Sequence, residues 1–165
     1  MNSPTQDPVV SLPRSALSTL FRRCVERGDP GIEAVREAGD RAGGGLLATL
    51  AEAPAALPAS EFWSRLDAAL RRAGLGSVSY RPVSQRSGAL AWRDSVEAPE
   101  ELPGGACCHF AAALLGGVLS RAANRPVAVR EVRCGGGQPC WFMFGSATTI
   151  REVPAGVDLG GAGRW

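Results

Sequence analysis

Residues 107–140 read CCHFAAALLGGVLSRAANRPVAVREVRCGGGQPC, and this stretch decides the fold. The residues from Ala106 to Ala122 are apolar on nearly every side, which predicts a helix buried at the centre of the protein. The β-branched run 127–132 and the aromatic run 140–144 predict two antiparallel strands joined by the turn at 135–139. Four of the five cysteines and the single histidine lie within these elements or at their ends.

The upstream half of the chain predicts three further helices and a hairpin. The spacing of apolar residues predicts the helices over residues 12–27, 29–50 and 60–73. Ser60 is the expected N-terminal cap of the third helix. Glycines in the second helix make sense where another backbone packs closely, but the triple glycine 43–45 could also break that helix.

Alternating apolar and polar residues predict the two strands of the hairpin, around 77–81 and 89–92, with the turn at 85–88. The polar, proline-containing residues 95–105 predict a loop. The order of helices, hairpin, helix and hairpin predicts an α+β fold in which helices pack on a small antiparallel sheet.

Length and composition favour one domain, because 165 residues of which 45% are hydrophobic can bury a substantial core. We expect this domain over 12–153, with a disordered segment 1–11 and a flexible tail 154–165. The 18 basic residues, all arginine, nearly balance 16 acids, so no nucleic-acid partner is expected. The start of the chain does not resemble a secretory signal, and no apolar run reaches about 18 residues, so we expect a cytoplasmic protein without a membrane span.

In a reducing compartment, the five cysteines are better interpreted as metal ligands, reactive groups or core residues than as disulfides. Cys108 falls in the first turn of the predicted central helix, where unpaired N–H groups and the helix dipole favour a thiolate. Glu131 and Cys134 would face opposite sides of a regular strand, so joint ligation requires a bend near Arg133. With Cys140 they would form a closed four-coordinate zinc site, which stabilises a fold and does not catalyse.

The spacing of these residues leaves alternatives open. Cys134 and Cys140 flank a tight turn and could be neighbouring core residues, or a disulfide in an oxidising compartment. Cys107 could take the place of Cys108. Glu131 could instead pair with a neighbouring arginine on the surface.

Residues 108–117 (CHFAAALLGG), Arg125-Pro-Val, 131–134 (EVRC) and 140–142 (CWF) resemble the vinyl-4-reductase domain family, also described as predicted hydrocarbon-binding domains. The resemblance covers about residues 15–150 and is weaker in the N-terminal half. It implies a fold similar to the small subunits of the transport-particle tethering complex, and a homodimer. In the family's phenol sensors a zinc is held by a Cys, a Glu and two further Cys in this order, which match Cys108, Glu131, Cys134 and Cys140. Two departures are a shorter loop between the last two cysteines and Ala113 in place of a helix glycine.

The resemblance favours a binding module for a hydrophobic or aromatic small molecule, with a sensory role as one use of such a module. An apolar pocket between sheet and helices, braced by the zinc, would receive the ligand. Its candidate lining residues are mostly aromatic, and each could equally be plain core: Trp63, Tyr80, Trp92, His109, Phe110 and Phe142. One alternative is a vinyl reductase or an accessory protein of chlorophyll or other tetrapyrrole metabolism, although the chain carries no dinucleotide fingerprint. Another is a protein-interaction subunit.

Overall fold

The structure is a computed structural model that describes residues 12–50, 54–97, 108–134 and 137–153. The expected terminal segments 1–11 and 154–165, most of the expected loop 95–105, and Cys107 lie outside these ranges. The helices and strands follow one another as α1 (Arg14–Val25), α2 (Asp29–Leu50), η1 (Pro54–Ala56), α3 (Ala59–Arg72), β1 (Ser77–Ser84), β2 (Ser87–Arg93), α4 (His109–Ala122), β3 (Ala128–Arg133), β4 (Cys140–Gly145) and α5 (Ala147–Arg151).

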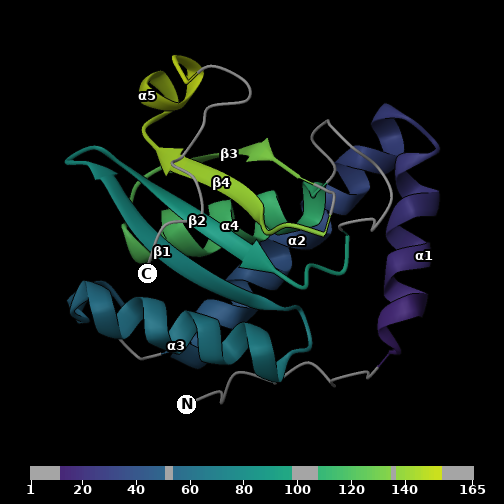
Figure 1. Cartoon of the computed structure of the whole chain (residues 1–165), viewed down its shortest axis with the longest axis horizontal. Coiled ribbons are helices and arrows are strands. Elements are labelled where there is room, and N and C mark those ends of the chain that lie inside the picture. Colours follow the sequence, from purple (N-terminus) through teal and green to yellow (C-terminus); the bar gives the residue numbers. More distant parts are fainter. Residues whose placement is uncertain (1–11, 51–53, 98–107, 135–136, 154–165) are drawn as a thin grey trace, which may run out of the picture.

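The four strands form one antiparallel sheet in the order β1-β2-β4-β3 (Figure 1). Alternation along the strands sends Leu90, Trp92 and Phe142 into a core shared with α1–α4. The intervening residues face the other side of the sheet, where Trp141 and Met143 pack with Ile150 of α5. The predicted α+β class, with helices packed on an antiparallel sheet, is confirmed.

The contact between α2 and α4 is close because α2 presents glycines to its partner. A Cβ atom added at Gly43 would lie 2.5 Å from the carbonyl oxygen of Leu114. One added at Gly39 would collide with the carbonyl oxygen of Phe110 and would lie 3.0 Å from the Cβ of Ala113. Since α2 runs unbroken through residues 43–45, the triple glycine does not end the helix. Gly39 and Gly43 therefore allow the backbones of α2 and α4 to approach closely. Gly45 has no such role, because nothing lies within 4 Å of a Cβ added there, and it only lowers the helix propensity of α2.

Two helix starts differ from expectation. The third helix begins at Ala59 after Pro58, whose carbonyl accepts from the N–H of Phe62, so Ser60 lies in the first turn and is not the cap. The central helix begins at His109, which makes Cys108 its N-cap residue. No helix within the four described ranges is long and apolar enough to cross a membrane.

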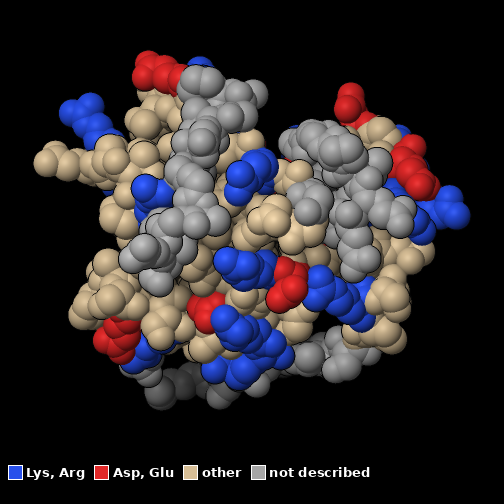
Figure 2. Space-filling view, in the orientation of Figure 1, with Lys and Arg blue, Asp and Glu red and all other residues tan. Residues whose placement is uncertain are grey.

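Basic and acidic side chains lie beside one another on the face shown in Figure 2. Along the helices of the protein, ion pairs join residues four positions apart, among them Arg65 with Glu61 and Arg71 with Asp67. Such exposed pairs contribute about 0.3–0.5 kcal/mol each. The core, and not this surface, therefore holds the elements together.

Candidate metal centre

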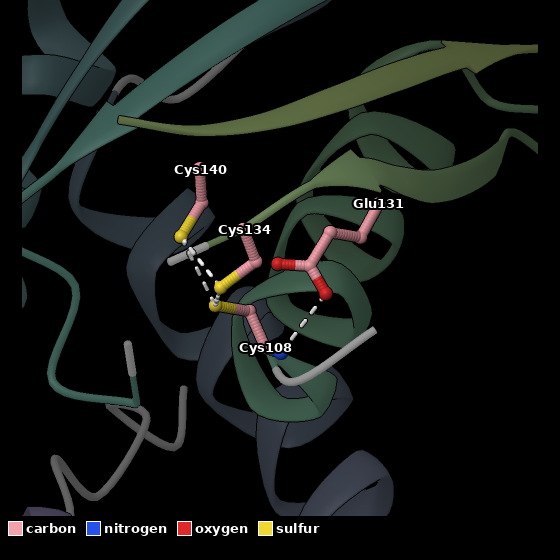
Figure 3. A group of neighbouring side chains, drawn as sticks. All are labelled: Cys108, Glu131, Cys134 and Cys140. Atoms are coloured by element: carbon pink, nitrogen blue, oxygen red, sulfur yellow. Dashed lines mark hydrogen bonds between the residues drawn. The ribbon is translucent and has the colours of Figure 1, made fainter. Parts of the chain in front are cut away.

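Four side chains from three elements converge at one end of the sheet (Figure 3). One ligand atom from each of Cys108, Glu131, Cys134 and Cys140 lies within 4.8 Å of the others. The sulfur of Cys108 is 3.4 Å from that of Cys140 and 3.5 Å from that of Cys134, and the last two sulfurs are 3.1 Å apart. A tetrahedral zinc with Zn–S bonds of about 2.3 Å separates its sulfurs by about 3.8 Å. The cluster is therefore compatible with a metal ion after shifts of less than about 1 Å.

An irregularity in β3 brings two of these side chains to the same side. Glu131 pairs with Phe142, but Arg133 pairs with Trp141, where a regular register would give it Cys140. The extra residue on β3 is a β-bulge, which turns the end of the strand toward the helix. The bend predicted near Arg133 is thereby confirmed.

The start of α4 contributes in a different way from that expected. The N–H of Cys108 donates to Oε2 of Glu131 at 3.1 Å. The carboxylate of Glu131 is therefore directed toward the start of α4 and not only toward neighbouring arginines. The N–H groups of Phe110 and Ala111 donate to the carboxylate of Glu97, at 2.8 and 2.7 Å. The expectation that unpaired N–H groups of this turn stabilise a Cys108 thiolate is therefore wrong, because a carboxylate already occupies them.

The electrostatics of the cluster favour a cation. A hydrogen bond to Cys140, burial and the negative charge of Glu131 all raise the pKa of Cys108. Three thiols and a carboxylate this close cannot all carry charge unless a positive charge joins them. A divalent metal supplies that charge and deprotonates the thiols it binds.

The state of the sulfurs sets a condition on metal binding. The 3.1 Å between Cys134 and Cys140 excludes a disulfide between them, since an S–S bond is about 2.0 Å long. Cys134 is disulfide-bonded in this structure, whereas Cys24, Cys108 and Cys140 are thiols. One sulfur cannot hold both a disulfide and a metal, so the site requires reduced Cys134.

Glu97 is a residue of this region that the sequence analysis did not single out. Burial, the largest influence, raises its pKa to about 7 despite the hydrogen bonds from Phe110 and Ala111, and the nearby charge of Glu131 adds to the rise. An anion at a helix N-terminus is a familiar arrangement. The eleven residues between Glu97 and His109, however, conceal the pairing from any local sequence pattern.

Glu97→Gln should change how the stability of the metal-free protein depends on pH. The folded pKa of about 7 exceeds the ordinary 4.5, so the native state binds the proton more tightly than the unfolded state does. Wild-type stability should consequently fall as pH rises from about 4.5 to 7, whereas glutamine cannot ionise. Between pH 5 and 8 the melting temperature of the wild type should therefore fall relative to that of the variant. The exposed Glu61→Gln is the control, and a pH-independent difference for Glu97→Gln would contradict the assignment.

The six candidate ligand-lining residues do not form a single group. Trp63 of α3 stacks on Tyr80 of β1, with ring centroids 4.6 Å apart and planes at 12°. Phe144, which the sequence analysis did not select, joins them at 5.5 Å from Trp63 and 6.0 Å from Tyr80. All three are half-buried. They form an aromatic cluster, Trp63–Tyr80–Phe144, between α3 and the sheet.

The other four candidates lie deeper or closer to α4. Trp92 and Phe142 are fully buried, 6.0 Å apart, and the indole N–H of Trp92 donates to the carbonyl of Leu75. Phe110 packs on Phe21 of α1 at 4.9 Å. His109 is half-buried, and burial together with the charge of Arg36 lowers its pKa. Trp92, Phe110 and Phe142 therefore belong to the buried core, and His109 alone of these four is half-buried.

A surface depression of about 370 Å³ lies elsewhere, between α2 and α4. None of the six candidates lines it; its walls are Glu33, Arg36, Glu37, Asp40, Ala113, Gly116, Gly117 and Ser120. Asp40 is engaged there with Arg121, which donates to both carboxylate oxygens at 2.9 and 2.8 Å. The depression is therefore charged and distinct from the aromatic side of the molecule.

No protein-family model matches this chain, and no curated protein sequence matches it. Among solved structures, its fold is similar to the crystal structure of the phenol-responsive sensory domain of the transcription activator PoxR, determined with phenol. The similarity has a TM-score of 0.69 and covers 90% of this chain and 80% of that chain, at 15% sequence identity. At this identity the likeness shows the fold alone.

Proposed function

We propose that this chain is a cytoplasmic binding domain for a hydrophobic or aromatic small molecule, sensory in character and braced by a structural zinc ion. The zinc ligands would be Cys108, Glu131, Cys134 and Cys140. The observation that carries the proposal is the convergence of these four side chains in a fold similar to a phenol-responsive domain. A homodimer belongs to the same proposal.

The donor set supports zinc over other metals. Three sulfurs and one carboxylate suit a tetrahedral, sulfur-rich centre, whereas Mg²⁺ and Ca²⁺ prefer oxygen ligands. Four protein ligands leave no position for a reacting water, so the metal would stabilise. Because the ligands come from the start of α4, from β3 and from β4, the ion would fasten the central helix to the sheet.

The aromatic cluster supports a ligand with an aromatic ring. Trp63, Tyr80 and Phe144 offer ring faces and edges that are half-buried and not sealed in the core. Stacked or edge-on aromatic contacts contribute about 0.5–1.5 kcal/mol beyond the burial of area. A planar apolar guest could insert beside these rings at little cost in conformational entropy.

Trp63→Ala should weaken the binding of phenol, used here as the probe, by at least about tenfold, which corresponds to about 1.4 kcal/mol. Isothermal titration of the reduced, zinc-loaded protein measures the affinity. The matched control is Trp141→Ala, which removes the same side chain from the opposite face of the sheet. Both variants should lower the melting temperature, but only the first should affect phenol. Absence of binding by the wild type to both phenol and toluene would refute the proposal.

A further inference from the structure

A short segment after β2 contacts the cluster without belonging to its four ligands. Asp94 adopts a left-handed conformation with φ of 56° and turns the chain directly after the strand. Ser95, which follows, is 4% exposed. Its Oγ lies 3.8 Å from the sulfur of Cys108. A buried hydroxyl beside a candidate thiolate ligand is positioned to influence that ligand.

The hydrogen-bond partners of Ser95 determine in which direction its hydroxyl donates. The N–H of Glu97 donates to Oγ of Ser95 at 3.3 Å, so the oxygen already acts as an acceptor. A metal-bound thiolate has no proton and can only accept. The hydroxyl proton of Ser95 is therefore directed to the sulfur of Cys108 once a metal is bound.

The same segment is anchored to two helices. Nη2 of Arg14, at the start of α1, donates to the carbonyl of Ser95 at 3.0 Å. The carboxylate of Glu97 accepts from the N–H groups of Phe110 and Ala111 in the first turn of α4. These contacts fix the backbone of residues 95–97 against the turn that carries Cys108.

We propose that Ser95 is a positioning residue of the metal centre, whose hydroxyl donates a hydrogen bond to the Cys108 thiolate and, supported by Arg14 and Glu97, holds that sulfur at the metal. This inference rests on the proposed metal site. A hydrogen bond to a ligating sulfur withdraws electron density from it. Removing the bond should change the electronic spectrum of a coloured metal, because the thiolate becomes a stronger donor. It should also loosen the ion, because the sulfur is no longer held in position.

Cobalt is a suitable probe, because Co²⁺ takes up tetrahedral thiolate sites and shows sulfur-to-metal charge-transfer bands. The full chain is reduced and titrated with Co²⁺ in the wild type and in Ser95→Ala. We expect the charge-transfer band of the variant to move to lower energy. We expect its cobalt affinity, measured against a competing chelator, to fall about tenfold, at the lower end of the 10–100-fold range for outer-shell partners. Ser95→Thr, which keeps the hydroxyl, should restore the band.

Ser120→Ala is the control for a purely structural effect. Oγ of Ser120 accepts from the N–H of Val127 at 2.9 Å, near the other end of α4 and about 18 Å along the helix from Cys108. This variant should lower the melting temperature and leave the cobalt band unchanged. Arg14→Met, at the exposed end of α1, removes the support of Ser95 without a buried cavity and should shift the band in the same direction, by less.

Two negative outcomes are distinguishable. If wild-type protein shows no thiolate-cobalt band, the metal site itself fails, and the inference fails with it. If the wild type binds cobalt and Ser95→Ala has the same band position and the same affinity, the metal site stands and the role of Ser95 is refuted.

Discussion

Cys108→Ser should abolish the bound zinc of the purified, reduced protein and lower its melting temperature by roughly 6–12 °C, the shift expected for a loss of about 3 kcal/mol in a domain of this size. Structural zinc sites can contribute far more than this in small peptides. Here the sheet and helices bury a core of their own, so the metal-free protein should remain folded. Elemental mass spectrometry and thermal unfolding, on protein purified without a histidine tag, measure the two effects.

Cys24→Ser provides the matched control, because it makes the same chemical change at a half-buried cysteine of α1 outside the cluster. It should leave one zinc per chain. Cys107→Ser separates the two neighbouring cysteines, since a ligand role for Cys107 would transfer the zinc loss to that variant. Equal zinc content in wild type and Cys108→Ser, or none in either, would contradict the assignment. The cysteines would then be packing or redox groups.

The four long helices and the four strands could be predicted because each one carries a local periodic pattern, whereas the five-residue helix α5 was not predicted. The apolar run of α4 and the alternation in β1 and β2 depend on which residues face the core, and that information lies within a few residues of sequence. The bend in β3 was predictable for a chemical reason. Glu131 and Cys134 can share one ion only if the strand is irregular between them.

Features that depend on contacts between distant segments could not be predicted in this way. The carboxylate of Glu97 contacts the first turn of α4 although eleven residues separate Glu97 from that helix, and the contact between Ser95 and Cys108 likewise joins residues far apart in the sequence. Phe144 was not selected because its place in the aromatic cluster depends on Trp63 and Tyr80. Those two rings are brought together by the packing of α3 against β1, which no local sequence pattern shows. The candidate ligand-lining residues were chosen mainly because they are aromatic, whereas in the structure some of them are buried in the core and others are half-buried.

Gly43→Ala and Gly45→Ala should change stability in opposite directions, although the substitution is the same and the positions lie two residues apart on α2. At Gly43 the new Cβ would meet the backbone of α4, 2.5 Å from the carbonyl oxygen of Leu114 and 3.1 Å from the amide nitrogen of Val118. Backbone atoms cannot rotate away, so the helices must separate, at a cost of about 1–3 kcal/mol. At Gly45 nothing lies within 4 Å of the new Cβ, and alanine should stabilise the helix by about 1 kcal/mol.

The packing of α2 on α4 should also affect the metal centre, because it sets the position of the first turn of α4. A Cβ at Gly39 would collide with the carbonyl oxygen of Phe110, only two residues after Cys108. Separation of the helices at that point displaces the first turn of α4 and with it one ligand. Gly39→Ala should accordingly weaken cobalt binding as well as lowering stability, whereas Gly45→Ala should raise stability and leave cobalt binding unchanged. Urea unfolding and cobalt titration on the same three proteins measure both effects. Equal cobalt affinity in all three would show that the ligands are held by the sheet and the Ser95–Glu97 segment alone, without help from the packing of α2.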